Sequence, residues 1–191
     1  MTGPVAVVRA ALRLLVRSPG PAFLAAGAAA LVNAVPDVLR HLPVWSSPSL
    51  AAALAVDLVG FLTGLAAQLW VTGAVAALPD GGGLRPRGAL GRGAGLAWRA
   101  VRTAPSAVAA GVVVGGGISA LITVPVSVAA LGAEHVLGPL DTPAAGAFAV
   151  ATVSDVVATW GTLPILALVL VLAARAAGAR AGGSSDPGTG Q

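Results

Sequence analysis

Two acidic side chains are the first candidates for chemistry, because they are the only acids inside the long apolar stretches of the chain. Asp57 and Asp155 each lie near the start of such a stretch. A charge in the bilayer centre is costly, so an intramembrane acid is a candidate proton or ion site. The residues that follow, 58–78 and 156–174, already span a bilayer, so both carboxylates can lie at the outer interface near a helix N-terminus. We therefore expect a structural role, with an ion or proton site as the alternative.

The other reactive side chains form no recognisable catalytic or metal site. Ser154, Asp155 and His135 are the residue types of a hydrolase triad, but no nucleophile turn accompanies them. His41 and His135 belong to different loops, and two separate histidines do not make a metal site. The chain has no cysteine, which excludes disulfides and thiolate chemistry. The sequence therefore predicts a protein that is not an enzyme and that binds no metal or cofactor.

The composition indicates a membrane protein. Of the 191 residues, 57% are hydrophobic and only 9% are charged, against roughly a quarter charged in a soluble domain. The mean hydropathy is +0.91, and several apolar runs exceed the roughly 18 residues that mark a transmembrane helix. We predict an all-α fold, a polytopic membrane helix bundle.

The apolar runs and the proline- and glycine-rich breaks define the elements of one membrane domain, residues 1–180. Transmembrane helices are expected at residues 21–39, 50–78, 105–131 and 144–174. The first of them is short for a full span. Residues 181–191 have a disordered composition.

Two further segments, 4–17 and 84–104, are predicted to be amphipathic helices that lie in the membrane plane. Arginines recur along one face of each segment, where they would contact the phosphates of anionic lipid headgroups. The arginines of these two stripes are Arg9, Arg13, Arg17, Arg92, Arg99 and Arg102.

The distribution of arginine predicts the orientation. Ten of the eleven arginines fall in the N-terminal segment, the 79–104 loop and the tail, and only Arg40 falls in an opposite loop. Positive charge is enriched on the cytoplasmic side of membrane proteins. We therefore expect a multi-pass protein of the cell (inner or plasma) membrane with four spans and both termini in the cytoplasm, its amphipathic helices on the cytoplasmic face.

Glycines four residues apart predict where helices pack closely, because small side chains let two helix backbones approach. The second span carries Gly60 and Gly64, and the third carries Gly111 and Gly115.

The two halves of the chain resemble each other. An arginine and a hydroxyl residue, followed by a proline, end both amphipathic segments, at Arg17-Ser18 and at Arg102-Thr103. Each half continues with a Gly/Ala-rich span, an outer loop and a span that begins close to an aspartate. This order predicts a parallel two-fold internal repeat, related by an axis along the membrane normal.

The in-plane helix that ends in Arg17-Ser18-Pro19 and the segment Arg92–Arg102 also carry a family resemblance. In these features the chain resembles poorly characterised bacterial multi-pass integral membrane proteins, which are similar to the membrane domain fused to some glycerophosphodiester phosphodiesterases. The resemblance covers most of the chain. The 191 residues contain no phosphodiesterase barrel and fewer spans than those relatives usually show, so no catalytic residue carries over.

Two classes of function stay open at this point. The first is a non-enzymatic packing, accessory or lipid-interacting protein in an anionic bilayer, with a second copy or another membrane protein as partner. The second is a small transporter or channel subunit that uses Asp57 and Asp155. Nucleic acid is not an expected partner, because a lipid surface accounts for every arginine.

Overall fold

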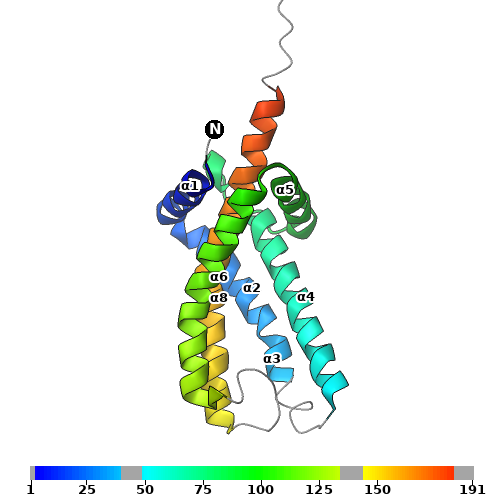
Figure 1. Cartoon of the computed structure of the whole chain (residues 1–191). Coiled ribbons are helices and arrows are strands. Elements are labelled where there is room, and N and C mark those ends of the chain that lie inside the picture. Colours follow the sequence, from blue (N-terminus) through cyan, green and yellow to red (C-terminus); the bar gives the residue numbers. More distant parts are fainter. Residues whose placement is uncertain (1–2, 40–48, 134–143, 183–191) are drawn as a thin grey trace, which may run out of the picture.

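Helices make up almost all of the chain that the computed structural model describes, which is residues 3–39, 49–133 and 144–182. Within these ranges there is no strand. The elements are α1 (Pro4–Arg17), α2 (Pro19–Asn33), α3 (Val35–Leu39), α4 (Leu50–Ala74), the 3₁₀ helix η2 (Leu78–Asp80), α5 (Ala89–Thr103), α6 (Pro105–Leu131) and α8 (Ala145–Gly182) (Figure 1). His41, His135 and residues 183–191 of the predicted tail lie outside the described residues.

The helix bounds differ from the predicted ranges for local reasons. α4 ends at Ala74 rather than near residue 78, because Pro79 has no N–H to donate to the Val75 carbonyl and its ring crowds that carbonyl. α5 begins at Ala89 rather than at residue 84, since Gly88 has a left-handed φ of 65° that glycine tolerates best. α8 continues past residue 174 to Gly182, because this Ala-rich stretch contains no proline to end it.

α8 is the central helix, and α1, α2, α4, α5 and α6 all pack against it. α6 runs beside α8 along its length, and α2 lies between this pair and α4 (Figure 1). α1 and α5 lie across one end of the long helices. We call this the basic end, defined by α1, η2, α5 and the turns of α8 from Arg175 onward.

Three helices are long and apolar enough to cross a membrane: Leu54–Asp80, Pro105–Leu131 and Ala145–Ala176. The count rises to four if α1 and α2, which meet at an angle of 99°, form one broken span. In α8, 56% of the most apolar stretch is buried, against 11% in the α4 span and 17% in α6. The outer helices therefore expose apolar side chains such as Phe61 and Leu121, which suits contact with lipid.

At the basic end, α2 and α6 each begin after one non-helical residue, and the two residues have similar dihedral angles. Ser18 separates α1 from α2 with φ −134° and ψ 57°, and Ala104 separates α5 from α6 with φ −145° and ψ 55°. A proline opens the next helix in both cases. Proline is favoured there because the first helical N–H has no intrahelical acceptor.

Among the described glycines, those where α4 crosses α5 leave the least room for a side chain. A Cβ atom on Gly73 would overlap the carbonyl oxygen of Ala89, and one on Gly93 would overlap the carbonyl oxygen of Leu69. The two backbones therefore touch, with glycine required on both sides of the crossing.

A tryptophan holds α2 against α8. Trp160 Nε1 donates a hydrogen bond of 2.7 Å to the carbonyl oxygen of Phe23, and the two rings meet edge to face with centroids 5.9 Å apart. Gly27 makes room for this indole, because a Cβ there would lie 3.3 Å from Trp160 Nε1.

We predict that Gly73→Ala and Gly93→Ala each destabilise the protein, because the added methyl group must push two backbones apart. Overpacking of this kind lowers the free energy of unfolding by about 1–3 kcal/mol or more. The measurement is thermal unfolding of the purified chain in mild detergent.

Gly95→Ala is the matched control for this prediction. Gly95 lies on α5 and a Cβ there meets nothing within 4 Å, so alanine should stabilise the helix by about 1 kcal/mol. Equal unfolding midpoints for Gly73→Ala and Gly95→Ala would contradict the backbone contact.

Candidate functional site

The two aspartates of the apolar stretches occupy different surroundings. Asp57 is exposed on α4, and Asp155 is half-buried on α8. Neither lies in the first turn of its helix, so the expectation that a helix N-terminus stabilises them is wrong, since that effect fades within one turn. Among the described residues, no three His, Cys, Asp or Glu side chains gather as metal ligands would.

The four predicted packing glycines make contacts of different closeness. A Cβ on Gly111 would lie 2.9 Å from Val169 Cγ1, so α6 approaches α8 tightly there. A Cβ on Gly64 would lie 3.2 Å from Asn33 Oδ1. At Gly60 and Gly115 the nearest atoms would be 3.9 and 3.8 Å away, which is ordinary van der Waals contact.

A cleft with neutral polar side chains lies among α2, α4, α6 and α8. Its volume is about 300 Å³, and neither Asp57 nor Asp155 lines it. The polar side chains of its wall are Asn33, Gln68, Ser119, Thr159 and Thr162. Hydroxyls and amides can hold water or a neutral ligand, but the wall carries no acid, base or charged group.

The predicted lipid-facing arginines are all exposed, but they differ in what they contact. Arg9, Arg13 and Arg17 lie on α1, whose opposite face buries valine, alanine and leucine. Arg102 places its guanidinium over the ring of Trp98, 4.4 Å from the ring centroid. An exposed tryptophan stacked with arginine suits the boundary between lipid and water.

Two arginines from other helices donate to carbonyls at and just beyond the C-terminal end of α4, where the last carbonyls of a helix lack N–H partners. Arg92 Nε, from α5, donates to the Gly73 carbonyl at 3.3 Å. Arg175 Nη2, from α8, donates to the Ala76 carbonyl at 2.6 Å. A positive charge is favourable there because the helix dipole is negative at its C-terminus.

Arg92 also fixes the loop before α5. Its Nη1 donates to the Arg87 carbonyl at 2.7 Å, and its Nη2 donates to the Arg85 carbonyl. The Arg85 N–H in turn donates to the Ala74 carbonyl at 3.0 Å. One guanidinium thus ties α4, the loop and α5 together.

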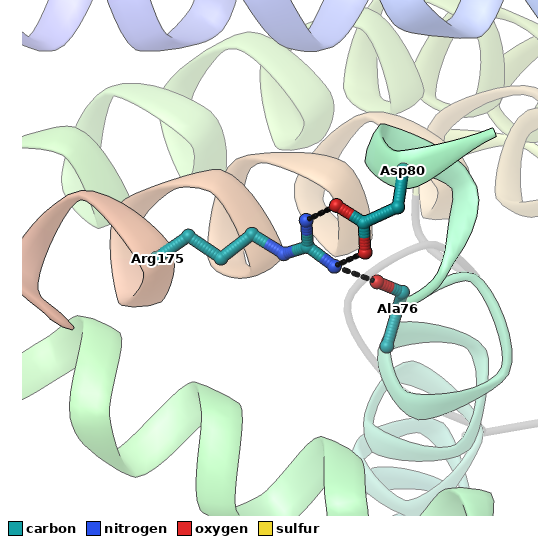
Figure 2. A network of polar contacts seen from close by, with 3 residues as sticks. All are labelled: Ala76, Asp80 and Arg175. Atoms are coloured by element: carbon teal, nitrogen blue, oxygen red, sulfur yellow. Dashed lines mark hydrogen bonds and ion pairs between the residues drawn. The ribbon is translucent and has the colours of Figure 1, made fainter. Parts of the chain in front are cut away.

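Arg175 forms the ion pair of the basic end. Nη1 and Nη2 reach the two carboxylate oxygens of Asp80 at 2.5 and 2.7 Å, in a bidentate arrangement (Figure 2). The pair joins η2 to α8, and both side chains stay partly exposed. Exposed pairs add little stability by themselves, although bidentate geometry is the strongest form.

These groups line a pocket at the basic end, which we call the arginine pocket. It has a volume of about 430 Å³ between η2, α5 and α8. Its charged residues are Asp80, Arg85, Arg92, Arg99 and Arg175. Four guanidinium groups against one carboxylate leave the wall with a strong positive charge, so the arrangement can attract and hold an anion.

The sequence indicated only part of this pocket. Arg92 and Arg99 were predicted as lipid contacts, whereas Arg85, Arg175 and Asp80 were not singled out. A usable signal existed, because Asp80 and Arg175 both lie near the C-terminal ends of long apolar runs. Their pairing depends on η2 lying beside the turn of α8 that carries Arg175, which the sequence does not state.

No protein-family model, curated protein or solved structure matches this chain. The resemblance to the multi-pass membrane proteins named above stays a prediction.

Proposed function

We propose that this chain is a non-enzymatic integral membrane protein whose basic end rests on the anionic headgroups of the cytoplasmic leaflet. It crosses the cell membrane four times, with α2 and α3 as the first span and α1 in the membrane plane, and both termini lie in the cytoplasm. It acts by packing against a membrane partner or by organising lipid.

The observation that carries this proposal is the separation of charge from apolar surface. α1 and α5, which carry exposed arginines, both lie at the basic end (Figure 1), while α4 and α6 expose large apolar side chains along their length. This division matches the two phases of a bilayer, with headgroups at one end and acyl chains around the spans.

A parallel internal repeat is part of the proposal. The nearly equal dihedral angles at Ser18 and Ala104 support it, each before a proline. This pairs Ser18 with Ala104, one residue beyond the pairing with Thr103 that the sequence predicts. The packing of α1 on α8 and of α5 on α4 also supports it, because each in-plane helix then contacts the last span of the other half.

The alternative of a transporter or channel subunit that uses Asp57 and Asp155 lacks comparable support. The polar cleft among the helices is the natural place for a transported ligand, and neither aspartate lines it.

We predict the orientation of introduced cysteines, which report without background because the chain has none. Ser47→Cys and Gly138→Cys should react with a membrane-impermeant thiol reagent on intact cells. Gly83→Cys and Ser185→Cys should react only after the cells are opened. Labelling of Ser185→Cys from outside would contradict the proposed topology.

We also predict that a singly charged anionic lipid stabilises the full chain. In nanodiscs that contain phosphatidylglycerol, the unfolding midpoint should exceed that in neutral phosphatidylcholine, and high salt should remove the difference. Each arginine near an anionic surface contributes about 1 kcal/mol. Replacing Arg9, Arg13 and Arg17 together by glutamine should therefore remove most of the α1 share of this stabilisation.

Replacing the same three arginines by lysine is the matched control, because the charge stays in place. The lysine variant should keep the stabilisation by phosphatidylglycerol. Equal midpoints in neutral and anionic nanodiscs for the unmodified protein would overturn the lipid-surface role.

A further inference from the structure

The arginine pocket holds more positive charge than the protein neutralises. Arg175 and Asp80 compensate each other. The N–H groups of Arg92 donate hydrogen bonds to backbone carbonyls. These bonds orient its guanidinium but do not cancel its charge. In the described part of the chain, the side chains of Arg85 and Arg99 donate no hydrogen bond. Asp80 is the one acid on the pocket wall, so three of the four positive charges of the wall are not balanced there.

The floor of the pocket is kept open by glycine. Gly91 and Gly95 line it together with Arg92 and Arg99 of the same helix. A Cβ on either glycine would meet nothing within 4 Å. Because residues three and four apart share a helix face, Gly95 leaves a gap on the face between Arg92 and Arg99. Any larger side chain at this position would occupy the space where a ligand would lie.

The pocket is also held in shape before any ligand arrives. α5 is fixed to α4 by the contact of Gly73 with Gly93, and the Arg85 backbone is fixed by its bonds to Ala74 and Arg92. A site whose groups are already positioned loses less conformational entropy on binding. The guanidinium of Arg92 and the backbones that carry Arg85 and Arg99 are therefore in place before a ligand binds.

We propose that the arginine pocket binds a doubly charged phosphate group, a phosphomonoester, as the headgroup of a membrane lipid. A phosphomonoester carries about −1.5 to −2 charges at neutral pH, so it balances more of the pocket's excess positive charge than a singly charged group does. Planar guanidinium groups bind phosphate oxygens in pairs. A volume of about 430 Å³ is that of a small-molecule site, which has room for a headgroup beyond the phosphate itself.

The residues have distinct roles in this site. Arg85 and Arg99 contact the phosphate oxygens directly, Arg92 presents a fixed positive charge, and the Arg175–Asp80 pair forms the wall toward α8. The inference rests on the proposed lipid-facing role of the basic end, because that role brings headgroups to the pocket.

The test measures the unfolding midpoint of the full chain in neutral detergent at constant ionic strength. The probes are short-chain phosphatidic acid, short-chain phosphatidylglycerol and inorganic phosphate. Binding to the native state raises the midpoint in a concentration-dependent way. Phosphatidic acid should raise it clearly, and phosphatidylglycerol, whose phosphodiester carries one charge, should need at least roughly ten times the concentration for the same shift.

Inorganic phosphate distinguishes a site that needs a whole lipid from a site that recognises the phosphate group alone. A shift with phosphatidic acid alone supports a lipid ligand that needs its glycerol and acyl parts. A shift with both phosphatidic acid and inorganic phosphate supports recognition of the phosphate group itself. A shift with neither, or equal shifts with phosphatidylglycerol and phosphatidic acid, overturns the proposal.

Paired variants test whether phosphatidic acid binds in the arginine pocket. Arg99→Gln should weaken phosphatidic acid binding about ten-fold or more, whereas Arg87→Gln, the same change on an exposed arginine outside the pocket wall, should leave it nearly unchanged. Gly95→Leu should block binding without altering charge, and Gly20→Leu, at another exposed glycine with open space around it, should not. Equal losses in Arg99→Gln and Arg87→Gln would overturn the pocket assignment.

Failure here can be told apart from failure of the proposed function. If the pocket binds no phosphate but phosphatidylglycerol nanodiscs still stabilise the chain through the α1 arginines, only the pocket assignment fails. The unfolding midpoint of each variant without ligand confirms that it is folded before its binding is compared.

Discussion

The backbones of α4 and α5 touch where Gly73 meets Gly93, and the charged groups of the basic end take their positions from this contact. It brings Arg92 within reach of the Gly73 carbonyl, and it holds Arg99 along the same pocket wall. Two helices can approach this closely only without side chains between them. The contact therefore converts an arginine-bearing segment into a fixed part of the bundle.

A second constraint concerns the end of α4, which finishes at the level of the charged loop. The carbonyls of Gly73 and Ala74 accept hydrogen bonds from Arg92 and from the Arg85 N–H, and the Ala76 carbonyl just beyond the helix accepts one from Arg175. These donors replace water at a helix end that is packed against two other helices. The guanidinium groups thus have a structural task and an electrostatic one, because completing the helix also concentrates positive charge in one pocket.

The apolar runs and the prolines predicted most of the helices correctly, since length and hydropathy determine which segments can span a bilayer. α1 and α6 have the predicted bounds. The α4–α5 contact was not predictable, because 26 glycines offer many equivalent packing motifs. The spacing of Gly60 and Gly64 fits the usual motif better than that of Gly73 and Gly93, yet the latter pair makes the closer contact.

The candidate site was harder to predict than the helices. Sequence reasoning ranked Asp57 and Asp155 first, because isolated acids in apolar stretches stand out. The structure instead gathers charge at Asp80, Arg85 and Arg175, residues at or beyond the ends of apolar runs. Charges at such ends look like ordinary flanking residues until the packing of three helices brings them together.

Hydrogen exchange of the full chain measures whether the glycine contact fixes α5 to α4. Amides of residues 93–100 should exchange slowly, because opening α5 requires breaking its contact with α4. In Gly73→Ala these amides should exchange much faster, while those of residues 165–171 in the buried part of α8 should change little. Fast exchange of α5 in the unmodified protein, or no response to Gly73→Ala, would contradict the account.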